Sequence, residues 1–99
     1  MDGTLAEYEG NHHAHIGRPL LPMVERIKGW IAAGKEVRIF TARVSHGLPH
    51  DASQHELIRV WTTEHCGQAL VATCMKDDGC EMICDDRARQ VEFNTGRVL

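Results

Sequence analysis

The stretch from Leu20 to Phe40 constrains the fold of this chain most. Apolar residues recur there at the spacing of one helix face, with Pro22 near the start of the pattern and Gly34 just past its end. A short β-branched run, Glu36–Phe40, follows at once and is typical of a buried strand. A helix that leads directly into a buried strand predicts an α/β fold with a parallel sheet. The residues of the helical stripe are Leu20, Met23, Val24, Ile27, Trp30 and Ile31.

The same alternation continues along the chain. Ser53 and Glu56 form a capping-box pattern before a second amphipathic helix, which should stop near Gly67. Two further strands are predicted at Ala69–Cys74 and Glu81–Cys84. We therefore expect a three-layer, Rossmann-like parallel sheet with helices on both faces.

Size and charge narrow the class of protein. With 99 residues, one domain spanning residues 1–99 is expected, ending in a turn at residues 94–96. The net charge is −3 without a basic stripe, which argues against non-specific nucleic-acid binding. No apolar run approaches the roughly 18 residues needed to cross a bilayer, and the start is not a secretory signal. These features favour a soluble, cytoplasmic protein that does not enter a membrane.

Polar side chains follow each predicted strand. Thr41 follows the first, Lys76 the second and the pair Asp85-Asp86 the third, while Asp2-Gly-Thr4 opens the chain. In parallel sheets such residues meet at the carboxyl edge of the strands. One hydroxyl, one lysine and three carboxylates are suited to holding a phosphate on a hard cation.

These segments resemble the four ordered motifs of the haloacid dehalogenase-like hydrolases, and the resemblance covers essentially the whole chain. It implies a small, capless, magnesium-dependent phosphatase core that forms an aspartyl-phosphate and acts on a phosphate monoester. The matching segments are Asp2-Gly-Thr-Leu5, Ile39-Phe-Thr-Ala-Arg43, Lys76-Asp77 and Cys84-Asp-Asp-Arg87.

The resemblance also implies roles for single residues. Asp2 matches the general acid/base, whose backbone carbonyl contacts the metal. Thr41 matches the phosphate-binding hydroxyl and Lys76 the basic residue of the third motif. Asp85 matches the Mg²⁺ ligand, with Asp86 holding a metal-bound water. The implied metal set is therefore Asp2, Asp85 and Asp86, and the substrate is a small phosphorylated molecule or phosphate itself.

The chain departs from the family at its first motif, Asp-x-Asp-Gly-Thr. Met1 falls on the variable position, so the nucleophilic aspartate and the central strand before it are absent. We expect an N-terminally truncated chain that does not form the aspartyl-phosphate, whether the truncation is genuine or an internal methionine was taken as the start. The loss of a central strand predicts a weakened fold, or closure of the gap by another segment or subunit. Homo-oligomers through exposed strand edges would follow.

Each assignment has a structural alternative. Thr41 could cap a turn, Lys76 could lie in a solvated turn, and Asp85 with Asp86 could form an Asx turn or helix cap. Arg43 could contact the substrate, as could Arg87, but an arginine beside acidic groups is more often a structural counter-ion.

The loop at residues 8–18 carries His12, His13 and His15. Imidazoles suit zinc or nickel, but no cysteine or carboxylate stands at ligand spacing, and the loop could instead form a small flap over the substrate.

Two other functions stay open. One is a degenerate module that binds magnesium and phosphorylated ligands, or a partner, without turnover. The other is a response-regulator-like or nucleotide-binding domain, which the Asp-Gly-Thr-Leu start, the Thr-Ala-Arg triplet and the lack of a glycine-rich phosphate loop disfavour.

Overall fold

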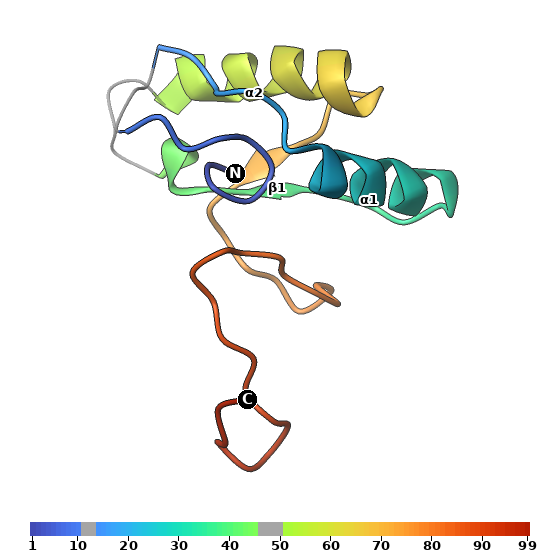
Figure 1. Cartoon of the computed structure of the whole chain (residues 1–99), viewed down its shortest axis with the longest axis vertical. Coiled ribbons are helices and arrows are strands. Elements are labelled where there is room, and N and C mark those ends of the chain that lie inside the picture. Colours follow the sequence, from blue (N-terminus) through green and yellow to red (C-terminus); the bar gives the residue numbers. More distant parts are fainter. Residues whose placement is uncertain (11–13, 46–50) are drawn as a thin grey trace.

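The computed structural model describes residues 1–10, 14–45 and 51–99 and has a small α/β fold (Figure 1). Two short strands, β1 (Ile39–Phe40) and β2 (Ala72–Thr73), pair in parallel, with Ile39 opposite Ala72 and Phe40 opposite Thr73. Between them along the chain lie a 3₁₀ turn and a helix, so the connection is the crossover that parallel strands require. The parallel α/β class predicted from the sequence is thereby confirmed.

Helix α1 (Leu21–Ala32) follows the predicted pattern closely. A proline occupies its first turn, where a missing N–H breaks no helical hydrogen bond. Val24 and Ile27 are buried, and Gly34 has a φ of +82°, the left-handed conformation that commonly ends a helix.

Helix α2 (Asp51–Cys66) supplies the centre of the core. Ile58 and Thr62 are fully buried, and the helix stops directly before Gly67, which has a φ of +87°. The predicted capping box was wrong, because the helix begins at Asp51 and Ser53 already lies inside it.

The N-terminal segment is held against the helices by backbone pairing. The N–H of Glu7 donates to the carbonyl of Arg18, and the N–H of Leu20 to that of Leu5, both at 2.8 Å. The indole N–H of Trp61 on α2 donates to the carbonyl of Gly17 at 3.1 Å. Gly17 must be glycine, because a Cβ there would lie 2.3 Å from the carbonyl oxygen of Glu7.

The sheet is smaller than predicted. Glu81–Cys84 was expected to form a strand, but these residues are exposed and have no regular structure. The parallel register directs the N–H and C=O of Phe40 away from β2, and no described strand pairs with that edge. A strand without a neighbour has no partner for its hydrogen bonds, which explains why the β-branched runs yield only two-residue strands.

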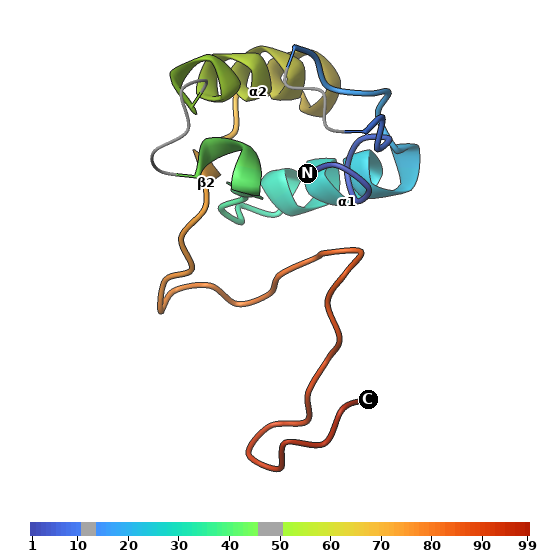
Figure 2. The same ribbon diagram turned by 90° about the vertical axis from the view of Figure 1, so that its left-hand side faces the viewer.

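The chain after β2 extends away from the helices (Figures 1 and 2). It ends in a small hairpin in which Val91 bridges Val98 across the predicted turn, where Asn94 and Gly96 have φ values of +59° and +76°. The radius of gyration is 14.1 Å, compared with about 13 Å for a compact domain of this length.

Within the residues that the structure describes, no helix is both long and apolar enough to cross a membrane.

Replacing Ile58 with alanine should lower the free energy of unfolding by about 3 kcal/mol, because the side chain is fully buried and leaves a cavity. Val60→Ala on the same helix is the control, since Val60 is 49% exposed, and it should change stability by less than about 1 kcal/mol. Urea denaturation followed by circular dichroism measures both. Equal effects of the two variants would contradict the described packing of α2.

Candidate functional site

A partly buried ion pair joins the first and second sequence motifs. The side chain of Arg43 is 8% exposed and that of Asp2 is 23% exposed. Arg43 donates from Nε to Oδ2 of Asp2 at 2.7 Å and from Nη2 to Oδ1 at 2.8 Å. Both carboxylate oxygens of Asp2 are therefore engaged by one guanidinium in the bidentate geometry that makes such pairs strong.

The remaining contacts of Arg43 fix its position at the end of β1. Its Nη1 donates to Oε1 of Gln54 on α2 at 2.8 Å, and its Nη2 also donates to the main-chain carbonyl of His15 at 3.1 Å. Its backbone N–H donates to the hydroxyl of Thr41 at 3.1 Å, so Thr41 caps the 3₁₀ turn η1 (Ala42–Val44). This capping leaves the hydroxyl proton of Thr41 able to donate to a ligand.

Arg43 also sets the charge state of Asp2. Burial alone would raise the pKa of the Asp2 carboxyl, but the hydrogen bonds and positive charge of Arg43 outweigh it and hold that pKa below its ordinary value. Asp2 is therefore an anion at neutral pH.

A second set of contacts joins the first motif to the fourth. The hydroxyl of Thr4 donates to Oδ1 of Asp86 at 2.9 Å and accepts from the N–H of Asp86 at 3.0 Å. Gly3 has a φ of +85°, and a Cβ on it would lie 2.9 Å from Oδ2 of Asp86. Only glycine lets the Asp86 carboxylate lie against this turn.

The acidic residues gather around the Met1 amino group. Burial lowers the pKa of that group, while the negative charges of Asp2, Asp85 and Asp86 oppose the shift. All three acidic residues of the predicted metal set therefore act electrostatically on this amino group.

The metal site itself is not preformed. Oδ1 of Asp85 accepts from the N–H of Arg87 at 2.8 Å, which is the Asx turn expected of a structural role. Across the described ranges, no three histidine, cysteine or acidic side chains are arranged to hold a metal ion. Mg²⁺ usually takes only one or two protein carboxylates together with water and phosphate oxygens, so the donor chemistry of Asp85 and Asp86 does fit that ion.

Lys76 lies apart from the ion pair, on a groove of about 450 Å³ that Thr4 also lines. Apolar walls of this groove come from α1, from β1 and from the extended segment after β2, and include Met23, Ile27, Trp30, Val37, Ile39 and Ile83. Lys76 has no hydrogen-bond or ion-pair partner in the described part of the chain and is exposed. The structure thus does not bring Lys76 into contact with Thr41 or Asp2.

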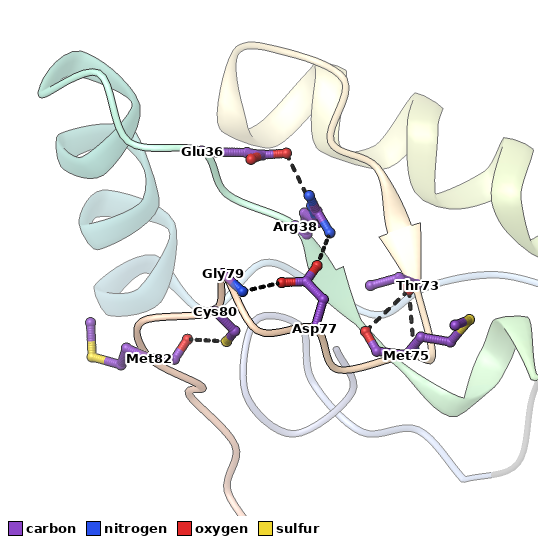
Figure 3. Close-up of polar contacts among 8 residues, drawn as sticks. All are labelled: Glu36, Arg38, Thr73, Met75, Asp77, Gly79, Cys80 and Met82. Carbon is purple, nitrogen blue, oxygen red and sulfur yellow. Dashed lines mark hydrogen bonds and ion pairs between the residues drawn. The ribbon is translucent and has the colours of Figure 1, made fainter.

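The turn after β2 is held by a neighbouring arginine (Figure 3). Arg38 donates to Glu36 at 3.0 Å and to Asp77 at 2.6 Å, and Asp77 also accepts from the N–H of Gly79 at 2.9 Å. The contacts of Asp77, the residue next to Lys76, are therefore structural.

The histidine loop takes part in this site through the main chain of His15. His12 and His13 lie outside the described residues. His15 pairs through Nε2 with Oε2 of Glu9 at 2.7 Å, and its carbonyl is the acceptor for Arg43.

Gln54 is the site residue that sequence reasoning missed. It is 1% exposed and accepts from Arg43. Its signal was present, because Gln54 stands four residues before Ile58 and seven before Trp61, on the apolar face of the second helix. A polar residue on such a face needs a buried partner.

Comparison of the chain with protein-family models, with curated proteins and with solved structures finds no match.

The ion pair predicts a pH dependence of stability. The pKa of Asp2 in the folded chain lies below the ordinary value of 3.8, so the pair stabilises the fold above that pH and is lost as the pH falls through the folded pKa. Asp2→Asn should therefore lower the free energy of unfolding by about 3 kcal/mol at pH 7, since it leaves a buried guanidinium without its anion. The difference between the two proteins should shrink below pH 3.8. Denaturant titrations from pH 7 to pH 2 measure it, and a constant difference would contradict the pairing.

Two glycines with the same backbone conformation allow a matched test of the contact between Thr4 and Asp86. Gly34→Ala introduces a side chain into open space and should cost about 1 kcal/mol of backbone strain. Gly3→Ala adds the same strain and also displaces the Asp86 carboxylate, so it should cost about 1 to 2 kcal/mol more. Thermal unfolding compares the stabilities, and the amide shift of Asp86 reports the displacement. An unchanged Asp86 signal in Gly3→Ala would argue against the contact.

Proposed function

We propose that this chain is a core of the haloacid dehalogenase-like type that binds Mg²⁺ and the phosphate group of a small phosphate monoester. The observation that carries the proposal is the pair of hydrogen bonds between Thr4 and Asp86, 82 residues apart in the sequence. They bring an Asp-Gly-Thr turn against an Asp-Asp pair, which is the juxtaposition that the order of the sequence motifs predicted.

In this proposal each residue has a separate task. Asp85 would ligate Mg²⁺, and Asp86, whose carboxylate accepts from Thr4, would assist it. Thr41 would donate its hydroxyl proton to a phosphate oxygen, and Lys76 would offset phosphate charge. Mg²⁺ supplies charge neutralisation for the phosphate oxygens.

We also propose that the two strands belong to a larger, Rossmann-like sheet with helices on both faces. The free edge of β1, at Phe40, and the apolar groove beside it support this, since an extended segment laid there would find both hydrogen-bond partners and apolar walls. In the family that the motifs resemble, this is the strand that ends in the nucleophilic aspartate. A second copy of the chain is the other candidate for closing the same edge.

In the family that the motifs resemble, a free aspartate carboxylate attacks phosphorus. Asp2 matches the acid/base position instead, and Arg43 holds it through both oxygens. Residues 1–99 are therefore proposed to bind Mg²⁺ and phosphate without turnover. This is also what the alternative, a degenerate binding module, would do.

One experiment separates these possibilities. Binding of inorganic phosphate in the presence and absence of Mg²⁺ is measured by calorimetry for the chain and for Asp85→Ala. Hydrolysis of an aryl phosphate is measured for the chain preceded by a β-branched strand that ends in aspartate. We expect Mg²⁺-dependent binding that Asp85→Ala weakens at least about tenfold, and turnover only in the extended protein.

The controls are matched in residue type. Asp78→Ala removes an exposed carboxylate outside the candidate site and should leave phosphate binding unchanged. The same strand ending in asparagine should give no turnover. Phosphate binding without hydrolysis in either extended protein would favour the degenerate module. Hydrolysis by the 99-residue chain at the rate of the extended protein would overturn the assignment of the nucleophile. The absence of any phosphate binding would reject the proposal.

A further inference from the structure

We propose that Arg43 is a positioning residue: anchored by α2 and by the segment at residues 14–17, it fixes Asp2 and thereby keeps Thr4 against Asp86. The sequence had left open whether Arg43 contacts a substrate or serves as a counter-ion. The consequence of this inference for phosphate binding rests on the proposed function, whereas its consequence for the N-terminal turn does not.

Most N–H groups of the Arg43 guanidinium already donate to protein acceptors and are not available to a ligand. A guanidinium carries five N–H groups. Four hydrogen bonds run to protein acceptors, two to Asp2, one to Gln54 and one to the carbonyl of His15. With its side chain only 8% exposed, Arg43 is built into the protein rather than turned toward solvent.

The residues that anchor Arg43 are themselves buried or hydrogen-bonded to α2. Gln54 is 1% exposed and lies one helical turn before the fully buried Ile58. The carbonyl of His15 belongs to a segment that the indole of Trp61 holds at Gly17, with a distance of 3.1 Å. Both contacts of the guanidinium outside Asp2 therefore lead back to α2.

Asp2 in turn belongs to a tightly hydrogen-bonded turn. The carbonyl of Met1 accepts from the N–H groups of Leu5 at 2.9 Å and Ala6 at 3.2 Å, and the N–H of Gly3 donates to the carbonyl of Ala6 at 2.7 Å. Thr4 lies inside this turn, so its position depends on where Asp2 is held. The ion pair thus connects α2, through Asp2 and the turn around it, to the contact between Thr4 and Asp86.

The test uses Arg43→Lys, which keeps the charge but loses the two-pronged pairing and the contact with Gln54. We expect amide hydrogen exchange of Leu5 and Ala6 to accelerate roughly tenfold more than that of Val24 and Ile27 in α1. Phosphate affinity in the presence of Mg²⁺ should fall roughly tenfold. Gln54→Leu preserves the size of the buried side chain and should cause the same changes in exchange and in phosphate affinity, but smaller ones. It replaces Arg43→Lys as the test variant if Arg43→Lys does not fold.

Arg59→Lys is the matched control, because Arg59 forms an exposed ion pair with Glu56 on the same helix. It should alter neither the exchange of Leu5 nor phosphate affinity. Uniform acceleration of exchange in the turn and in α1 would mean that Arg43 only stabilises the fold and would overturn the inference, as would no acceleration at all. If the unmodified chain binds phosphate, an unchanged affinity in Arg43→Lys would overturn it as well. If exchange accelerates in the N-terminal turn but not in α1, and the chain binds no phosphate, the positioning role of Arg43 is upheld and the proposed function is rejected.

Discussion

The pairing of Arg43 with Asp2 is the interaction on which the rest of the candidate site depends. Burying two charges is unfavourable unless their hydrogen bonds are satisfied, and here both carboxylate oxygens and four of the guanidinium N–H groups have partners. Replacing both partners of such a pair by apolar groups often changes stability little, whereas removing one partner is costly because the other charge is left uncompensated. It joins the N-terminal turn, the end of β1 and helix α2 in one network.

The helices and the last turn could be predicted from the sequence because their signals are local. The periodic apolar stripe and the glycine after it define α1, and Asn94 with Gly96 specifies the turn of the hairpin. Strands depend on their neighbours instead. Glu81–Cys84 has the composition of a strand, but no described strand pairs with it, so composition alone predicted a strand that does not form.

The candidate site, too, has features that the sequence could predict and features that it could not. The sequence placed Thr41 directly after a strand, and in the structure Thr41 follows β1 and accepts from the N–H of Arg43. It also suggested that the first and fourth motifs converge, but not that Thr4 would be the residue in contact with Asp86. Sequence could not show that Arg43 occupies both oxygens of Asp2, because that depends on a donor 41 residues away and on Gln54 behind it. Nor could it show that the residue next to Lys76 forms an ion pair with Arg38, which holds the turn after β2.

The extended course of the chain after β2 also bears on how the protein would be degraded. Arg87 and Arg89 lie in exposed backbone without regular structure, just beyond the contact of Asp86 with Thr4 and before the hairpin. Backbone of that kind enters the cleft of a trypsin-like protease without prior unfolding. Cleavage after Arg87 would release the hairpin and its uncovered Phe93, while the network around Arg43 and the Asp-Asp pair would stay in a single polypeptide.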